Sequence, residues 1–494
     1  MQVLLAGYNL DKEVIDELRR AAPPRLDVTP ETLSASYARI SRDPRPAEEL
    51  RRAARAEIEK ARRSNQTIIF KMGHHSVAEH AVFNFDLIGV SRLAIEEIEK
   101  FRLCSFTEKS QRYITLGGDF VLPAEIRGAG LERVFVETIT AQNSLYHELY
   151  EKLRPHVFEQ NPELAQNPKK HAILDGWAKE DARYVVSLAT EGQLGMTING
   201  RNLELLIRRF ASKDLAELRE INRNISALAK EIAPSILLFT AASEFDLQAY
   251  EDLKAASRGI APRKETRRDD VALVDWTKDG DDKILAALLH SAGNASFERC
   301  LRRVGRLSLR EKTAIVKLAF ERMEFYDFPL REFEYADMTF DIVCSASCFA
   351  QLKRHRMATL TSQDYDPELG TTLPQSIEAV GAAKEFRETI DRTNVVYGLL
   401  KKKAGRAADY VLTNAHRRRV LLKVNVREMY HISRLREDPT AQWEIRALSA
   451  AMSGLARKVM PLTCLLLGGK SSFPEVYHSV FGKSPKTPPP DFRA

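Results

Sequence analysis

The chain has few cysteines, no long apolar run and no signal peptide, and each absence argues against a class of protein. The five cysteines form an odd, scattered set, which argues against a disulfide framework and for a reducing compartment. No apolar stretch reaches the roughly 18–20 residues that a membrane-spanning helix needs. The first residues, MQVLLAGYNLDKEV, resemble a short buried strand and lack the charged start and cleavage site of a signal peptide. We therefore expect a cytoplasmic protein that does not enter a membrane.

Metal and nucleic-acid sites are also poorly represented. Cys344 and Cys348 lie four positions apart in an apolar run, but no second ligand pair lies nearby, so we interpret them as packing residues and predict no metal site. The net charge of +7 suits a nucleic acid or a small phosphorylated ligand. No basic stripe interleaved with aromatic residues supports stacking of single-stranded nucleic acid. We interpret the charge as a bias of a solvated surface toward an anionic substrate.

The sequence contains two successive sets of similar elements. Its 494 residues exceed one typical core, so two domains are expected. In the first half the periodicity predicts a helix over about 46–60, a strand over 81–90, a helix over 93–101, a polar loop over 105–112, and helices over about 130–152 and 201–232. In the second half it predicts a helix over 311–323, a strand over 333–343, a helix and polar loop, and a helical region from 427 onward.

Composition places the domain boundaries. Residues 258–270, RGIAPRKETRRDD, are charged and poor in apolar side chains, which is typical of a linker. The end, KSPKTPPPDFRA, is rich in proline. We predict a first domain over 1–250, a linker over 251–282, a second domain over 283–475 and a disordered tail over 476–494.

A short local match supports an internal duplication. The segment 197–201 reads TINGR and the segment 423–427 reads KVNVR, so that both are apolar–Asn–x–Arg and lead directly into a predicted helix. Two halves with the same order of elements and a shared junction indicate a duplicated module.

One polar loop in the first half has the chemistry of a phosphate site. Ser110, Arg112 and Tyr113 combine a hydroxyl, a guanidinium and a phenol, and arginine offers a phosphate two parallel N–H donors. The alternative is a solvated loop in which Arg112 pairs with Glu108.

The second half has a more concentrated basic motif, Arg354-His355-Arg356. Two neighbouring cations favour the neutral form of the histidine. The triplet can bind a phosphate or an electron-rich ring, or it can complement the dipole at a helix C-terminus. The residues alone leave both interpretations open.

The pattern GHHSVAEHxxFxF, GVSR and SFTEKSQRY resembles the signature of flavin-dependent thymidylate synthases, whose hallmark is Arg-His-Arg followed by Ser-x-Arg-Tyr. The second half resembles the family through Gln351, Arg-His-Arg, Asn425, Arg427, Arg436 and the segment AQWEI over 441–445. The resemblance covers most of both halves. It implies an α+β fold in two tandem copies, each an antiparallel sheet with a helical bundle.

The resemblance also assigns roles to individual residues. It implies catalytic roles for Arg102, Arg183, Arg354, His355 and Arg356. It implies substrate-binding roles for Ser105, Ser110, Gln111, Arg112, Tyr113, Gln351 and Arg436. It implies cofactor-binding roles for His75, Ser76, Glu79, Asn199, Arg201, Asn425 and Arg427.

Each half departs from the family pattern at different positions. In the first half Arg-His-Arg reads Lys100-Phe101-Arg102, and Glu97 stands where glutamine is frequent. In the second half the phosphate loop is acidic. An alignment without a gap puts Asp364 and Asp366 in place of serine and arginine, and an alignment with a short deletion puts Asp364 in place of arginine. The remaining replacements are Asp409 for Arg183, and Phe328 and Phe333 for His75 and His80.

These departures suggest that neither half is a complete site. In the family the sites lie at subunit interfaces of a homotetramer, so we expect a dimer of fused pseudo-dimers with hybrid sites. The resemblance implies reductive methylation of dUMP, or a related uracil nucleotide, to dTMP, with FAD as cofactor and NADPH and methylenetetrahydrofolate as co-substrates. The alternatives are a catalytically silent homologue that binds dUMP or flavin, and a basic nucleic-acid-binding protein that no motif supports.

Overall fold

The computed structural model describes residues 1–20, 29–40, 43–260 and 270–489. The chain forms two compact units, and each includes a segment from the other half of the sequence. The first unit comprises residues 1–145, 186–264 and 387–412, and the second comprises 146–185, 265–386 and 413–494. The long helices α7 (Glu132–Gln160) and α18 (Ala383–Ala404) carry the chain from one unit into the other.

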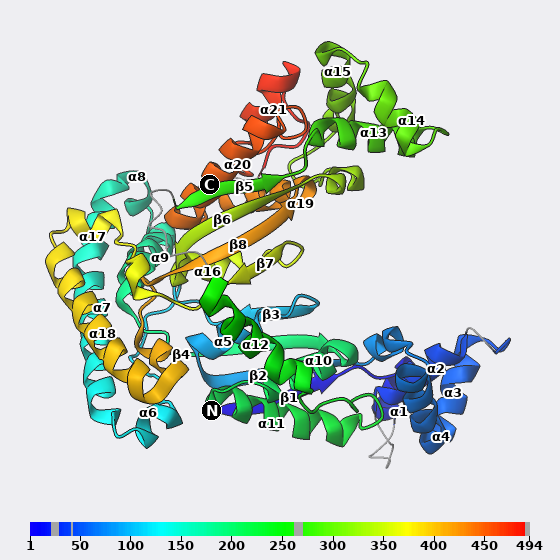
Figure 1. The fold of residues 1–494 in the computed structure, drawn as a ribbon, viewed down its shortest axis with the longest axis horizontal. Coiled ribbons are helices and arrows are strands. Elements are labelled where there is room, and N and C mark those ends of the chain that lie inside the picture. Colours follow the sequence, from blue (N-terminus) through cyan, green and yellow to red (C-terminus); the bar gives the residue numbers. More distant parts are fainter. Residues whose placement is uncertain (21–28, 41–42, 261–269, 490–494) are drawn as a thin grey trace. The chain divides into compact units, whose positions relative to one another are not determined.

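The first unit contains a four-stranded antiparallel sheet in the order β1-β2-β4-β3 (Figure 1). Its strands are β1 (Gln2–Tyr8), β2 (Val82–Ser91), β3 (Cys104–Glu108) and β4 (Glu191–Asn199). Phe83, Phe85 and Leu87 of β2 are fully buried and alternate with exposed residues, as expected for a strand with one face on the core. The strand predicted over 81–90 is therefore confirmed.

Both edges of this sheet differ from the sequence-based expectation. Residues 105–108, predicted as polar loop, form most of β3 because the strand pairs along one side only and needs few apolar residues. β1 was expected to be buried, but it is also an edge strand, and Leu4 is 47% exposed.

Helices cover the first sheet and extend from it. The helix α11 packs against β1 and β2, and α5 packs against β2 and β4. The helix predicted over 201–232 is broken at 212–215 into α10 and α11. The α-helices of the first unit that precede α7 are α1 (Lys12–Arg20), α2 (Glu31–Ile40), α3 (Ala47–Ala56), α4 (Ile58–Asn65), α5 (Arg92–Ile98) and α6 (Ala124–Gly128). After β4 they are α10 (Gly200–Ala211), α11 (Ala216–Ile232) and α12 (Glu244–Ile260).

The second unit contains a sheet of the same topology, in the order β5-β6-β8-β7. Its strands are β5 (Val271–Trp276), β6 (Asp337–Ser345), β7 (Thr359–Ser362) and β8 (Arg417–Asn425). Met338, Phe340 and Ile342 of β6 are fully buried in its core. The strand predicted from 333 begins at Asp337, because residues 331–335 form a 3₁₀ helix.

The helices of the second unit include two that come from the first half of the sequence, α8 (Pro162–Ala165) and α9 (His171–Ala182). Those before β7 are α13 (Gly280–Ala292), α14 (Phe297–Val304), α15 (Leu309–Phe320) and α16 (Ala346–Leu352). Those after it are α17 (Gln375–Ala379), α19 (Val426–Arg436), α20 (Trp443–Val459) and α21 (Phe473–Phe481). The helix α19 packs against β8 and α20.

Regular structure also occurs inside the predicted linker and tail. The strand β5 lies within residues 251–282 and pairs with β6, while residues 261–269 lie outside the described part of the chain. The helix α21 extends into residues 476–494, and its Tyr477 is buried against the core, although residues 490–494 are outside the description. Both elements contain apolar residues that pack against the core, but the neighbouring charged or proline-rich residues dominate the composition of these two ranges.

Among the described residues, every helix is too short or too polar to span a lipid bilayer.

Candidate functional site

The junctions after β4 and β8 have the same structure in the two units. Asn199 and Asn425 are the N-cap residues of α10 and α19, and their side-chain oxygens accept hydrogen bonds from the backbone N–H groups of Asn202 (3.0 Å) and Glu428 (2.8 Å). The apolar–Asn–x–Arg match in the sequence is therefore a strand–cap–helix junction that occurs twice. The chain contains two copies of one mixed helix-and-sheet module.

An ion pair follows each junction. Arg201 contacts Glu79 at 2.7 Å in the first unit, and Arg427 contacts Glu334 at 3.2 Å in the second. The structure thus brings together two residues predicted to bind a cofactor, Arg201 and Glu79. Arg201 remains 53% exposed at its side chain, so its guanidinium reaches solvent.

The other predicted cofactor residues lie on the short 3₁₀ helix over His75–His80. The His75 ring lies 6.1 Å from the ring of Phe70, and Ser76 is exposed. This helix lies close to α10, where an added Cβ on Gly200 would come within 2.8 Å of the carbonyl oxygen of Ala78. The close approach requires glycine and positions the His75–His80 segment beside Arg201.

A β-bulge changes the expected alignment of the halves. β2 has an extra residue at Gly89, where φ is +67°, and β6 does not. Val82 pairs with Asn199 in the first sheet, and Asp337 pairs with Asn425 in the second. The residue two positions before each of these strand residues is His80 in the first unit and Tyr335, not Phe333, in the second. The predicted replacement of two first-half histidines by Phe328 and Phe333 is therefore wrong.

The loop after β3 carries the predicted phosphate ligands. The hydroxyl oxygen of Ser110 accepts a hydrogen bond from the backbone N–H of Arg112 at 3.2 Å. The guanidinium of Arg112 lies 5.8 Å from the ring centroid of Tyr113, which is largely exposed. Ser105 on β3 and Arg102 before it are also exposed. Ser110 and Arg112 themselves are half-buried and lie two positions apart on this turn.

A hollow lies beside this loop. Gln111 lines it together with Thr190 and the buried ion pair of Arg92 and Glu108, whose atoms are 3.1 Å apart. Glu108, which the solvated-loop alternative pairs with Arg112, forms an ion pair with Arg92. Gln111, a predicted substrate ligand, therefore lines this hollow.

The corresponding loop of the second unit is acidic. β3 and β7 pair with β4 and β8 in the same register, and the residue after each strand continues the ladder. This register aligns the loops without a gap, so that Asp364 and Asp366 stand where the first unit has Ser110 and Arg112. Asp366 caps the next 3₁₀ helix by accepting a hydrogen bond from the backbone N–H of Glu368. Two carboxylates in this place repel a phosphate.

The second unit brings together three predicted site residues, Gln351, His355 and Arg436. The guanidinium Nε of Arg436 donates to His355 Nε2 at 2.9 Å, and its Nη2 donates to the backbone carbonyl of Gln351 at 3.1 Å. His355 is buried, whereas Arg354 is exposed and Arg356 is half-buried. The Arg-His-Arg triplet therefore does not act as one surface, and its histidine faces the interior.

The electrostatics around His355 differ from the sequence-based explanation. Burial, and then the charge of Arg436, lowers the pKa of His355 to about 3, so the ring is neutral. The neutral form was predicted, but from the flanking arginines. Glu428 and His431, which the sequence analysis did not select, also face His355, with Glu428 Oε1 at 3.6 Å from Nδ1. Burial raises the pKa of the Glu428 carboxyl and lowers that of His431.

The first unit has an aromatic pair in the equivalent place. Phe101 corresponds to His355, and Phe210 corresponds to Arg436 by the shared strand register. Their ring centroids lie 5.9 Å apart at an angle of 59°. An apolar contact has therefore replaced the histidine–arginine hydrogen bond.

A buried carboxylate organises the start of α5 in the first unit. Glu217 accepts hydrogen bonds from the backbone N–H and the hydroxyl of Ser91, both at 2.7 Å, and from the hydroxyl of Tyr410 at 2.6 Å. Burial raises the pKa of the Glu217 carboxyl and raises that of Tyr410 well above its usual value. Tyr410 belongs to the segment 387–412, which comes from the second half of the sequence.

The second unit repeats this arrangement with the halves exchanged. Glu444 accepts from the backbone N–H of Ser345 at 3.1 Å and from the hydroxyl of Tyr184 at 2.6 Å. Tyr184 comes from the first half of the sequence, and its ring stacks on Trp443. Gln442 and Trp443, in the predicted family segment 441–445, bind Tyr184 and Asp181 respectively. The equivalence of Ser91 with Ser345 and of Tyr410 with Tyr184 is the sequence signal that marks these two contacts as equivalent.

Arg183, predicted as a catalytic residue of the first-half site, belongs to the second unit. It is buried, and its carbonyl accepts a hydrogen bond from the side chain of Asn414 at 3.0 Å. Asp409, which corresponds to Arg183, belongs to the first unit and lies 3.7 Å from the amine of Lys401. Because each unit includes a segment from the other half of the sequence, Arg183 lies in the second unit and Asp409 lies in the first.

Comparisons with known proteins match both halves. The sequence model of the family described as "Thymidylate synthase complementing protein" matches residues 26–235 and 272–462. A UPF0159 protein of Chlamydia muridarum is 24% identical over 417 residues, which cover 80% of this chain and 78% of the relative. A flavin-dependent thymidylate synthase of Geobacter sulfurreducens is 31% identical over 169 residues, which cover 34% of this chain and 65% of the relative. The crystal structure of ThyX from Helicobacter pylori, complexed with FAD and dUMP, aligns with a TM-score of 0.30 at 18% identity, over 49% of this chain and all of the other.

Proposed function

The chain belongs to the thymidylate synthase complementing protein family, and from this premise we propose that it is a flavin-dependent thymidylate synthase or a close derivative of one. The proposed reaction is the reductive methylation of dUMP to dTMP with FAD, NADPH and methylenetetrahydrofolate. The fused chain is further proposed to pair with a second copy. The relatives named as flavin-dependent thymidylate synthases match part of the chain, which supports the reaction class.

The observation that carries the proposal is the contrast between the two loops. In the first unit Ser110 and Arg112 lie two positions apart on a half-buried turn, and arginine binds phosphate with paired N–H donors. In the second unit the same positions hold Asp364 and Asp366. We therefore assign the nucleotide phosphate to the first unit and expect one nucleotide per chain.

The first unit also suits the diphosphate of FAD. The half-exposed guanidinium of Arg201 lies beside the His75–His80 segment, and both are predicted cofactor ligands. Asn199 has a structural task, because its side-chain oxygen already caps α10. FAD, when bound, supplies the hydride chemistry, while the protein binds and orients the nucleotide and excludes water. The arginines stabilise negative charge on the pyrimidine and its phosphate.

One observation favours a second candidate, a catalytically silent protein that binds dUMP or flavin. The first unit has Phe101 and Phe210 where the second has a hydrogen-bonded histidine and arginine. A phenylalanine cannot donate a hydrogen bond to a flavin or a nucleotide.

A flavin and turnover assay separates the two candidates. The purified protein is loaded with FAD, its bound-flavin absorbance is recorded, and NADPH oxidation and dTMP formation are followed with and without dUMP. Oxidation and dTMP formation that require dUMP and methylenetetrahydrofolate support the enzyme. Bound flavin without dUMP-dependent turnover identifies the silent binder. Failure to bind FAD contradicts the proposed function.

A further inference from the structure

Three side chains of types that bind metals converge in the second unit. His355, Glu428 and His431 each offer one ligand atom, and the three atoms lie within 4.8 Å of one another. Glu428 and His431 are three positions apart on α19 and therefore share one face of that helix. His355 lies in the turn after α16, where its backbone N–H donates to the carbonyl of Leu352 at 3.1 Å and its own carbonyl accepts from Ala358 at 3.2 Å. The convergence therefore comes from two elements that are held separately.

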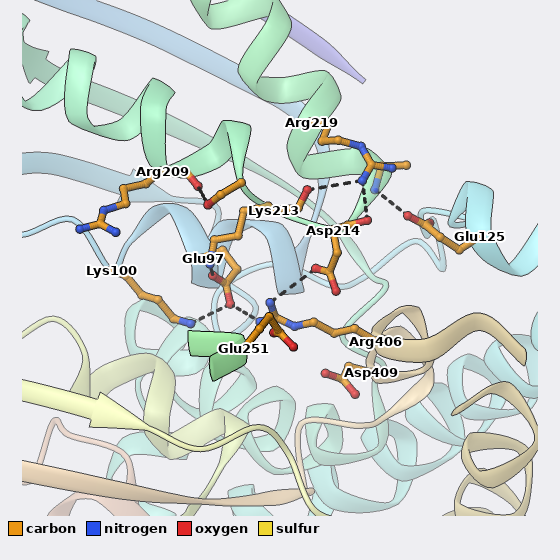
Figure 2. A network of polar contacts seen from close by, with 12 residues as sticks. Glu97, Lys100, Glu125, Arg209, Lys213, Asp214, Arg219, Glu251, Arg406 and Asp409 are labelled. Carbon is orange, nitrogen blue, oxygen red and sulfur yellow. Dashed lines mark hydrogen bonds and ion pairs between the residues drawn. The ribbon is translucent and has the colours of Figure 1, made fainter. Parts of the chain in front are cut away.

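Two of the converging atoms are buried without a hydrogen-bond partner. They are Nδ1 of His355 and Oε1 of Glu428, whose side chains are 1% and 9% exposed. By contrast, the buried carboxylate of Glu97 in the first unit has lysine and arginine nitrogens 2.7–2.9 Å from its oxygens (Figure 2). Buried polar atoms are normally satisfied in this way, because an unsatisfied one loses its hydration without compensation. The pair of His355 and Glu428 therefore calls for a partner that satisfies both atoms.

The distance between these two atoms fits two ligands of one metal ion. His355 Nδ1 and Glu428 Oε1 are 3.6 Å apart, whereas a nitrogen–oxygen hydrogen bond spans about 2.7–3.2 Å. Zinc binds histidine nitrogen and carboxylate oxygen at about 2.0–2.2 Å, so two such ligands at the tetrahedral angle lie about 3.3–3.6 Å apart. Two histidines and one glutamate also form the ligand set of a class of zinc sites that keep a fourth position for water. Distance and ligand type therefore agree.

Arg436 holds the ring of His355 in the orientation that the site needs. Its Nε donates to Nε2 of the ring at 2.9 Å, and because arginine only donates, the neutral ring carries its proton on Nδ1, toward Glu428. A metal ion that binds Nδ1 displaces this proton to solvent, and the guanidinium balances the charge left on the ring. The charge of Arg427, on the same helix as Glu428, is offset by an ion pair with Glu334 at 3.2 Å.

The ligand set is specific to the second unit. By the shared strand register and the two capping asparagines, the positions of His355, Glu428 and His431 correspond to Phe101, Asn202 and Leu205. The first unit therefore has no imidazole or carboxylate at any of the three positions. The unit that lacks the serine and arginine of the phosphate loop is the one that has the three ligands.

We propose that His355, Glu428 and His431 bind one divalent transition-metal ion, and that this ion is Zn²⁺, with water as the fourth ligand. The ring of His431 is half-buried, so an ion reaches the site from solvent on that side. Cys344 and Cys348, the pair considered from the sequence, take no part in it. The site goes beyond the proposed function, because it requires neither flavin nor nucleotide.

The test is a titration of the metal-free full chain with Zn²⁺ in the absence of FAD, followed by calorimetry and by the melting temperature. A single ion per chain and a rise in melting temperature are expected. Glu428→Gln and His431→Gln are each expected to weaken Zn²⁺ binding about a hundredfold or more, because each removes a ligand. Without metal, Glu428→Gln is expected to melt no lower than the wild type, since it removes a buried carboxylate, and this separates lost binding from lost folding.

The control variant is His290→Gln, which removes an exposed histidine on α13 and is expected to leave Zn²⁺ binding unchanged. Mg²⁺ is expected to bind far more weakly than Zn²⁺, because two of the three ligands are imidazoles. Absence of saturable Zn²⁺ binding, or binding that is unaltered in both ligand variants, would overturn the proposal. Zn²⁺ binding with the expected losses, in a chain that fails to bind FAD, would contradict the proposed function and keep this site.

Discussion

Equivalent positions hold a histidine–arginine pair in the second unit and a phenylalanine pair in the first. In each pair the two side chains match in polarity. Arg436 donates to His355 in the second unit, while Phe101 packs on Phe210 in the first. A mixed pair would leave a buried donor without an acceptor, which costs about 1–3 kcal/mol. The two residues of each pair are therefore expected to be energetically coupled.

A double-mutant cycle tests this coupling. Phe210→Arg alone is expected to lower the free energy of unfolding by about 2–4 kcal/mol, because a charged side chain replaces a fully buried ring. Adding Phe101→His is expected to recover about 1 kcal/mol by supplying the acceptor. Denaturant unfolding of the two single variants and the double variant measures the coupling. Strictly additive losses would contradict it.

The buried histidine of the second unit predicts a pH dependence. The pKa of His355 is lowered to about 3 in the folded chain, so the unfolded state binds more protons between that value and about 6.5. Its contribution to stability is therefore complete above about pH 6.5 and is lost as the pH falls toward 3, with a slope of up to about 1.4 kcal/mol per pH unit.

His355→Gln is expected to reduce the pH slope of the free energy of unfolding by the amount that corresponds to one proton. The free energy of unfolding is measured between pH 4 and 8, and the values at pH 8 serve as the reference because the histidine is neutral there in both states. His416, whose pKa burial lowers to about 4, adds a second slope of the same sign that remains in the variant. Equal slopes in the variant and the wild type would contradict the assignment.

At the scale of elements, the approach of α10 to the His75–His80 segment depends on Gly200. Its backbone N–H donates to the carbonyl of Ala81 at 2.8 Å, and an added Cβ would clash with the carbonyl of Ala78. Gly200→Ala is expected to cost about 1–3 kcal/mol of stability. It should also displace the segment that carries His75 and Ser76, and so weaken FAD binding.

Gly195→Ala is the matched control, because its added Cβ would meet the nearest atom only at 3.9 Å. Thermal unfolding and FAD titration are measured for both variants. If Gly200→Ala were as stable as the control and bound FAD equally, the close contact would not position the segment.

Elements with a clear apolar pattern were predictable, and those set by local geometry were not. The strand β2 and the helices α5, α7 and α15 follow from apolar periodicity in the sequence. The edge strand β3 depends on its pairing with β4. The break at 212–215 depends on carbonyls bound by Arg219, and the bulge in β2 depends on the positive φ of Gly89. None of these three features alters the apolar pattern, so the sequence analysis missed them.

The candidate site was predictable where the family signature names residues. Gln351, His355 and Arg436 were selected separately and converge in the structure. Glu217 and Tyr410 were not selected, because they lie 193 residues apart and nothing local marks them as partners. The same contacts among Ser345, Glu444 and Tyr184 in the second unit identify them as a repeated feature of the module.

At the scale of the whole molecule, each unit contains a segment from the other half of the sequence. These segments join the two halves even without the covalent connection at 261–269. The first unit includes 387–412, where Tyr410 binds Glu217, and the second includes 146–185, where Tyr184 binds Glu444. Each contact is made by a carboxylate and a phenol, which are strong partners; the Tyr410–Glu217 contact is buried and the Tyr184–Glu444 contact is partly buried.

A protease site inserted within 261–269 tests this joining. After complete cleavage in the folded protein, the two fragments are expected to co-elute in size-exclusion chromatography under native conditions. Tyr184→Phe combined with Tyr410→Phe should lower the denaturant concentration at which the fragments separate, since the buried carboxylate of Glu217 and the half-buried carboxylate of Glu444 each lose a donor. Separation of the wild-type fragments in native buffer would contradict the exchange.

The exchange also has a consequence for the order of events during synthesis. A ribosome releases the chain from its N-terminus at about 5–20 residues per second, and domains commonly fold as they emerge. The first unit cannot close when its own sheet is complete, because Tyr410 and the rest of 387–412 emerge last among its parts. The Glu217 carboxylate of the nascent protein therefore lacks its Tyr410 partner until the segment 387–412 has been synthesised, and in that interval the incomplete first unit is a natural client for chaperones.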